Sequence, residues 1–198
     1  MQVAFVPIIW YNFVMGALIL GRNEMLAILL KEFRALGFQG LSLSRIAEAT
    51  GLGKASLYHH FPKGKDEMAL QVMKFVKDWI QSEILIPIND KEIPPKKRLS
   101  HVLKTLDQFY EKGATACVIE MMLAGDVPPS VKGIVKECVE DLREGFISLG
   151  KDFGLSNDEA KKIAEQTLIG IQGSLIISRS LNDVGVFKRQ IKIIENYF

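Results

Sequence analysis

Apolar residues recur three and four positions apart along the chain beyond residue 65, and no long stretch alternates apolar and polar residues as a strand would. The spacing predicts helices over 65–85, 96–111, 117–124, 129–153, 156–181 and 184–196. Proline disfavours helix at and before itself, so Ile86-Pro87 and Ile93-Pro94-Pro95 predict a loop between the first two helices. An all-α protein follows from this pattern.

A shorter pattern over residues 42–61 predicts two small helices joined at a glycine. Ser42 is placed to cap the first helix, and Ile46 lies on its apolar face. Gly51 can adopt the left-handed conformation that ends a helix, and Gly53 is an acceptable N-cap for the second one. This layout is typical of a helix-turn-helix, whose second helix enters the major groove of DNA.

The second of these helices has two different faces. Leu57 and Phe61 are one turn apart and are expected inside. The candidate contacts with the DNA major groove are Lys54, Ala55, Ser56, Tyr58 and His59. The alternative interpretation is an ordinary helical hairpin that leaves these side chains in solvent.

The chain continues with Phe61-Pro62-Lys63-Gly64-Lys65, which predicts a helix break followed by a new helix N-terminus beside two lysines. Backbone N–H groups at such a terminus bind phosphate readily. Phosphate contacts fix the position of a protein on the duplex without reading bases. The candidate phosphate contacts are Ser42, Ser44, Arg45 and Lys65.

Residues 25–73 resemble the DNA-binding domain of the TetR family of transcriptional regulators, and the variant Tyr-His-His-Phe-Pro-x-Gly-Lys-Asp-Glu is similar to its LmrA/YxaF-like branch. The resemblance rests on Phe33, Gly37-Phe38, Ile46-Ala47, Gly51, Leu57-Tyr58-His59-His60-Phe61 and Lys65. Arg45 departs from the acidic residue usual in the family, and Gly53 from the usual serine or threonine. Both departures weaken helix capping, by about 1 kcal/mol each.

Charge supports a division of the chain into parts. Residues 22–77 contain nine Lys and Arg against five Asp and Glu, a net charge of +4, while the whole chain carries only +2. A basic N-terminal module on a mildly acidic body suits a protein that contacts DNA at one end. The expected organisation is an apolar extension over 1–21, a three-helix helix-turn-helix DNA-binding domain over 22–68, and a helical ligand-binding and dimerisation domain over 69–198.

The resemblance implies more about the C-terminal domain. It implies a homodimer, because residues 170–179 place small residues where a second helix can approach, with Gly170, Gly173, Ser174 and Ile177 as interface candidates. It also implies a small-molecule effector, apolar or aromatic, that releases a repressor from a palindromic operator. The candidate ligand contacts are Phe75, Trp79, Phe109, Tyr110, Cys117, Met121 and Gln166. The alternative for both sets is ordinary core packing.

Catalysis has little support in the sequence, and no cofactor or metal is expected. His59 and His60 are adjacent on a helix and face different directions, and Cys117 and Cys138 lack the spacing of a zinc site. Two such cysteines in a chain without secretory features are expected to be reduced thiols in the cytoplasm. An all-α enzyme or scaffold that ignores DNA is the remaining alternative from another class.

The first 21 residues contain no charge, and Val3 to Leu20 is almost wholly apolar. This composition fits a membrane segment, which would make the protein a membrane-tethered regulator. Pro7 and Asn12 interrupt the stretch, and no basic residues precede it. The preferred interpretations are a start assigned too far upstream, with Met15 or Met25 nearer the true start, or an additional helix that packs on the body.

Overall fold

A computed structural model of the chain describes residues 21–198, and within this range the fold is entirely helical. The expected all-α class is confirmed. The elements are α1 (Arg22–Gly40), α2 (Leu43–Thr50), α3 (Lys54–His60), α4 (Lys65–Ile80), η1 (Gln81–Leu85), α5 (Ile86–Asn89), α6 (Pro95–Phe109), η2 (Glu111–Gly113), α7 (Val118–Leu123), α8 (Pro129–Asp152), α9 (Asn157–Leu181) and α10 (Gly185–Glu195). The expectations for residues 1–20 lie outside the described residues.

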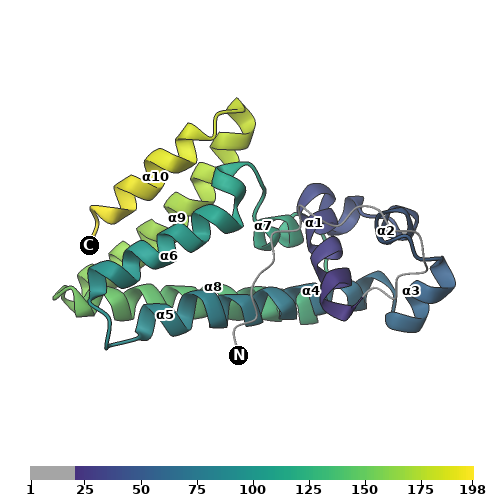
Figure 1. The fold of residues 1–198 in the computed structure, drawn as a ribbon, viewed down its shortest axis with the longest axis horizontal. Helices are drawn as coiled ribbons and strands as arrows, with labels where there is room; N and C mark the ends of the chain where they lie inside the picture. Colours follow the sequence, from purple (N-terminus) through teal and green to yellow (C-terminus); the bar gives the residue numbers. More distant parts are fainter. Residues whose placement is uncertain (1–20) are drawn as a thin grey trace.

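The molecule is elongated, and its first three helices gather at one end (Figure 1). Helices α1, α2 and α3 form that end, α4 and α8 run from it along the molecule, and the C-terminus lies at the opposite end. Phe33, Ile46, Leu57 and Phe61 fill the core of the three-helix end and are fully buried. The apolar positions expected on the inner faces of α2 and α3 therefore do form a core.

The long helix after α3 continues further than the sequence predicts. The chain passes from α4 through a π-helical turn, η1, into α5, so helical structure reaches Asn89 and Pro87 lies within it. The expected helix end before Pro87 is wrong. Proline is tolerated in the first turn of a helix, and in the preceding π turn Ile86 N–H donates to the carbonyl of Gln81, five residues back.

The C-terminal helices follow the expected boundaries within about two residues. Ser156 caps α9 by accepting a hydrogen bond from Glu159 N–H, and the Glu159 carboxylate accepts the Ser156 N–H in return. These bonds are the predicted capping box. The Ser156 hydroxyl also donates to the Glu159 carboxylate, and this bond, followed by the one from the Ser156 N–H, lowers the pKa of Glu159.

The N-terminal helices join the rest of the molecule through α1. Gln39 Nε2 donates to the carbonyl of Asp126 at 2.6 Å, and Gly37 approaches the carbonyl of Met121 so closely that an added Cβ would lie 3.2 Å from it. The ammonium of Lys65, at the start of α4, donates to the carbonyl of Phe38 at 2.8 Å. Helix α1 therefore contacts both α4, which links the three-helix end to the rest of the molecule, and the segment of α7 and the loop after it.

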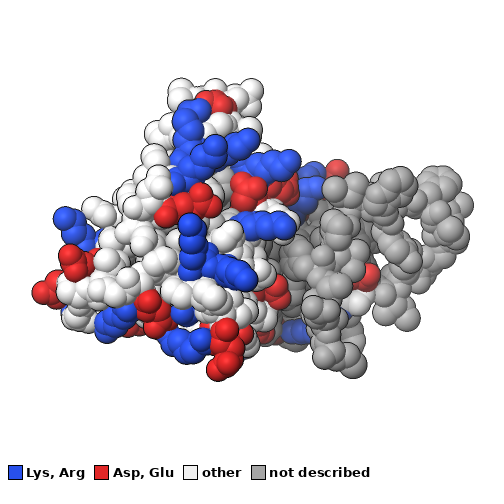
Figure 2. All heavy atoms as spheres, turned by 60° about the vertical axis from the view of Figure 1, so that its left-hand side comes forward, with Lys and Arg blue, Asp and Glu red and all other residues white. Residues whose placement is uncertain are grey.

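The surface at the C-terminal end carries charges of both signs (Figure 2). Blue side chains gather in the upper middle of this view, with red ones among them and along the lower edge. Residues 22–77 carry +4 and the rest of the chain is net negative. The positive excess therefore belongs to the segment that forms α1–α4 and not to the helices that follow it.

Candidate nucleic-acid interface and ligand cavity

The turn between α2 and α3 is fixed by its caps. Ser42 Oγ accepts a hydrogen bond from Arg45 N–H at 3.2 Å, and Gly51 ends α2 with a φ of 69°, which favours glycine. Gly53 begins α3 without a side-chain cap. The predicted caps of this helix-turn-helix are confirmed, and its second helix is only seven residues long.

The outer face of α3 presents the side chains expected to meet DNA. Lys54, Ala55, Tyr58 and His59 are exposed, whereas Ser56 is half-buried. Leu57 and Phe61 on the opposite face are buried in the domain core. A short helix held by its core face and polar on its outer face can enter a groove about 12 Å wide. The individual DNA contacts remain predictions.

The two basic residues among the expected phosphate contacts have partners within the protein. Arg45 Nε donates to the carboxylate of Glu32 at 2.8 Å, and its Nη1 donates to Glu48 at 3.2 Å. Hydrogen bonding to Glu32 is the largest cause of a raised pKa for Arg45. The ammonium of Lys65 lies on the Phe38 carbonyl and 4.6 Å from the centre of the Phe38 ring.

Both side chains thus have structural roles that no local sequence pattern indicates. The Arg45 side chain does not complete the cap of α2 as an acidic residue would. It pairs with Glu32 of α1 and so holds α2 against that helix. Ser42 and Ser44 are exposed on the outer side of α2.

An apolar cavity of about 20 Å³ lies between α4, α6 and α7. Its lining includes Trp79, Phe109, Tyr110 and Cys117, four of the seven residues expected to contact a ligand. Tyr110 O–H lies 3.4 Å from Cys117 Sγ, and burial raises the pKa of this tyrosine well above its ordinary value. A space of this volume holds about one water molecule, so a larger ligand requires the cavity to open.

The other three expected ligand residues lie elsewhere. Gln166 is exposed on α9, because its position falls on the outer side of that helix. Phe75 is half-buried against the core but does not line the cavity, and Met121 packs against Gly37 at the junction with α1. Helical spacing alone did not show which face of each helix borders the cavity.

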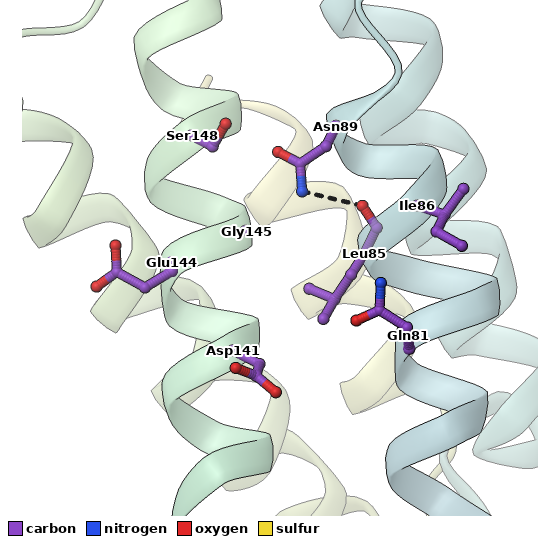
Figure 3. A pocket seen from close by; sticks show the side chains of 8 residues that line it. All are labelled: Gln81, Leu85, Ile86, Asn89, Asp141, Glu144, Gly145 and Ser148. Atoms are coloured by element: carbon purple, nitrogen blue, oxygen red, sulfur yellow. Dashed lines mark hydrogen bonds between the residues drawn. The ribbon is translucent and has the colours of Figure 1, made fainter.

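A second hollow is a groove of about 540 Å³ on the surface between η1–α5 and α8 (Figure 3). Asp141, Glu144 and Ser148 line it from α8, and Asn89 reaches toward them from α5 while donating to the Leu85 carbonyl at 2.9 Å. No local pattern in the sequence indicates this groove, since its lining comes from segments about 60 residues apart. Its polar walls differ from the apolar site expected for the effector.

The four expected dimer residues divide between two faces. Gly173 and Ile177 are exposed on α9. Ser174 is buried, and Gly170 packs so closely against Gln190 of α10 that an added Cβ would lie 2.3 Å from its amide nitrogen. Ser174 therefore faces the interior of the chain and Gly170 faces α10, whereas the assignment of all four residues to a dimer interface stays a prediction.

Both cysteines are buried free thiols. Burial raises the pKa of the Cys138 thiol to about 11. Among residues 21–198, no cluster of three or more His, Cys, Asp and Glu side chains is arranged to hold a metal ion. None of the described helices is both long and apolar enough to cross a membrane.

Comparison with known proteins agrees with this geometry. The model of bacterial regulatory proteins of the tetR family matches residues 26–72. The chain is 33% identical over 161 residues to the HTH-type transcriptional regulator LmrA of Bacillus subtilis (strain 168), which covers 79% of this chain and 85% of LmrA. It is 21% identical over 165 residues to the HTH-type regulator YxaF of the same organism, covering 82% of this chain and 86% of YxaF.

The fold is also shared with solved structures. A TetR transcriptional regulator from Legionella pneumophila superposes with a TM-score of 0.78 at 21% identity, covering 89% of this chain and 96% of that one. A helical body that carries a helix-turn-helix at one end, together with the family match and the similarity to LmrA, identifies the protein as a DNA-binding transcriptional regulator. The chain belongs to the TetR family, with LmrA and YxaF as similar members.

Proposed function

We propose that this protein is a ligand-responsive repressor that binds a palindromic operator as a homodimer and that a small apolar or aromatic molecule releases it. The observation that carries the proposal is the exposed outer face of α3, with Lys54, Tyr58 and His59, on a helix held by a buried inner face. A seven-residue helix reads few bases, so two copies on half-sites about one DNA turn apart are needed for specificity.

The proposed roles follow the two ends of the molecule. Residues 22–68 bind DNA, with Lys54, Ala55, Ser56, Tyr58 and His59 in the major groove and Ser42, Ser44, Arg45 and Lys65 near phosphates. Residues 69–198 bind the effector and the second protomer. Because Arg45 and Lys65 also stabilise the domain internally, we expect their phosphate contacts to be weaker than that of a lysine without such partners.

Selection of random duplex DNA by the purified protein at two salt concentrations tests the proposed function. We expect enrichment of one palindrome with two half-sites whose centres are one helical turn apart. Binding that shows no enrichment and vanishes at the higher salt concentration would contradict a sequence-specific regulator, because it would reflect phosphate contacts alone.

A matched pair of lysine variants locates the DNA surface. Lys54→Ala removes an exposed charge from α3, whereas Lys104→Ala removes an exposed charge from α6. We expect Lys54→Ala to lower affinity for the selected operator about tenfold and Lys104→Ala to leave it unchanged. Equal effects of the two variants would mean that α3 has no special contact with DNA.

The proposed dimer surface is the exposed apolar face of α9. Ile169 and Leu181 are 71% and 66% exposed, and Ile176 and Ile177 lie exposed between them. A row of apolar side chains on one helix is typical of a surface covered by a second subunit. Leu181→Glu is expected to halve the particle mass measured by light scattering, whereas Val139→Glu on the exposed side of α8 leaves it unchanged. A wild-type mass equal to one chain would refute the dimer.

A further inference from the structure

The ring of Phe109 lies between two other flat groups at the edge of the apolar cavity. The indole of Trp79 stacks on it with ring centres 3.8 Å apart and planes 14° from parallel. The guanidinium carbon of Arg34 lies 4.0 Å from the centre of the same ring. Two groups that both lie this close to the centre of the Phe109 ring must occupy its opposite faces. Arg34 of α1, Phe109 of α6 and Trp79 of α4 therefore form one continuous stack.

Arg34 enters this stack with most of its hydrogen-bonding capacity unused. Its Nη1 donates to the Phe109 carbonyl at 3.3 Å. Its Nε and Nη2 are buried and have no hydrogen-bond partner among the described residues. Burial lowers the pKa of Arg34, although the nearby Tyr110, Cys117 and Glu111 oppose the shift. A buried cation with unpaired donors is costly, so its retention calls for a function.

The two unpaired nitrogens define the kind of group that would complete the site. Nε–H and one Nη2–H lie parallel along one edge of a guanidinium, and this edge matches the two oxygens of a carboxylate. Other buried polar atoms nearby also lack partners: Thr115 Oγ1 and Gln172 Oε1. Thr115 N–H is bonded to the Tyr110 carbonyl, and Gln172 Nε2 lies 3.3 Å from Cys117 Sγ. Thr115 and Gln172 therefore lie next to the cavity, because Tyr110 and Cys117 line it.

We propose that Arg34 binds the carboxylate of a small aromatic acid whose ring enters the cavity beside Trp79 and Phe109. The proposal rests on the proposed function and specifies the effector as an acid. The cavity of about 20 Å³ is smaller than a benzene ring, so entry of the acid has to separate the stack. Arg34 belongs to α1 and Trp79 to α4, so the proposed acid would lie between a helix of the DNA-binding end and the long helix that follows α3.

The test uses benzoate, phenylacetate and cinnamate, each paired with its neutral amide. Calorimetric titration and the fluorescence of Trp79 in a Trp10→Phe background report binding to the full chain. We expect at least one acid to bind about tenfold more tightly than its amide, as expected for loss of a charge-assisted bidentate contact. If none of the acids binds at millimolar concentration, or if each amide binds as tightly as its acid, the proposal fails.

Arg34 variants test the anchor directly. Arg34→Met removes the charge, and Arg34→Lys keeps the charge without the two-donor edge. Both are expected to weaken acid binding tenfold or more and to leave binding of the amide unchanged. Arg143→Met, on the exposed side of α8, is the matched control and is expected to bind the acid as the wild type does. If Arg34→Met fails to fold, Arg34→Lys alone decides, and wild-type affinity in that variant overturns the proposal.

The DNA measurement separates this inference from the proposed function. If the protein selects an operator but the acids neither bind nor release it, only the acid site is wrong. If the protein selects no operator, the proposed function is wrong, whereas calorimetry with the acid and amide pairs still decides whether Arg34 binds carboxylates. Sulfate and phosphate at equal ionic strength serve as competitors, and binding of these ions with no acid bound would also overturn the proposal.

Discussion

Arg98 and Arg34 both place guanidinium nitrogens in the interior, but the protein surrounds them differently. Arg98 is 3% exposed, and its Nε donates to the Ile93 carbonyl at 2.9 Å. Its Nη1 donates to the Ile88 carbonyl at 2.6 Å and to the carboxylate of Asp152 at 2.8 Å. Arg34 has a single bond to a carbonyl and no ion pair with any residue that the structure describes.

The difference separates a structural arginine from one that is available for binding. Around Arg98, the carbonyls and the carboxylate tie α5, the following loop, α6 and α8 into one rigid joint. Around Arg34, aromatic rings supply packing and a cation–π contact but leave two donors unpaired. A fully partnered charge resists any rearrangement, whereas a partly partnered one gains free energy when a new acceptor arrives.

The largest effect is expected from breaking the Arg98 joint. Asp152→Ala leaves the Arg98 charge with carbonyl partners only and also removes the carboxylate that pairs with Lys91. We expect the free energy of unfolding to fall by about 2 kcal/mol, between the values for exposed and buried pairs, because Arg98 is buried and Asp152 is partly exposed. Urea unfolding at fixed protein concentration measures it. Asp152→Asn keeps an oxygen for Arg98, so a loss as large as that of Asp152→Ala would show that the charge, and not the hydrogen bond, is decisive.

Acid weakens the same joint. Burial raises the pKa of Asp152, but hydrogen bonds from Lys91 and Arg98 prevail, so its pKa lies below the usual 3.8. A carboxyl with a lowered pKa contributes stability that is complete above 3.8 and is lost as pH falls through the lowered value. We therefore expect thermal unfolding below pH 3.8 to show a steeper loss of stability in the wild type than in Asp152→Asn. Parallel curves for the two proteins would contradict the assignment.

The smallest effect is expected at Arg34. Replacing it with methionine removes a cation–π contact and one hydrogen bond but also removes an incompletely paired buried charge. These contributions oppose each other, so Arg34→Met is expected to stay within about 1 kcal/mol of the wild type in urea unfolding. A loss comparable to that of Asp152→Ala would mean that Arg34 is as structural as Arg98, and the comparison would no longer hold.

The sequence predicted the elements whose signals are local. Ser42 and Ser156 cap the helices that their positions indicate, and Gly51 ends α2 in the left-handed conformation. Leu57 and Phe61 are buried as the helical spacing of α3 requires. Each of these features depends on residues within one or two helical turns, so periodicity and capping rules are sufficient to find them.

Features that depend on distant segments were missed. Arg34 and Phe109 are 75 positions apart, so Arg34 could only be counted among the basic residues of the DNA-binding end. Gly170 was assigned to a dimer surface because nothing in its own helix shows that Gln190 of α10 lies against it. Pro87 was expected to end a helix, and only the π turn before it allows the helix to continue.

That π turn, Gln81–Leu85, also sets the phase of everything that follows it in the linker. A π turn contains one residue more than an α-helical turn, and each residue of a helix rotates the next by about 100°. Deleting one residue there would leave an ordinary α-helical turn with the same rotation, so Ile88 would keep its place against Gly145. Inserting one further residue before Leu85 would instead turn Leu85 and Ile88 away from Gly145, and the Ile88 carbonyl would leave Arg98 in the same movement. Hence a one-residue insertion in this turn should damage the protein far more than a one-residue deletion at the same place.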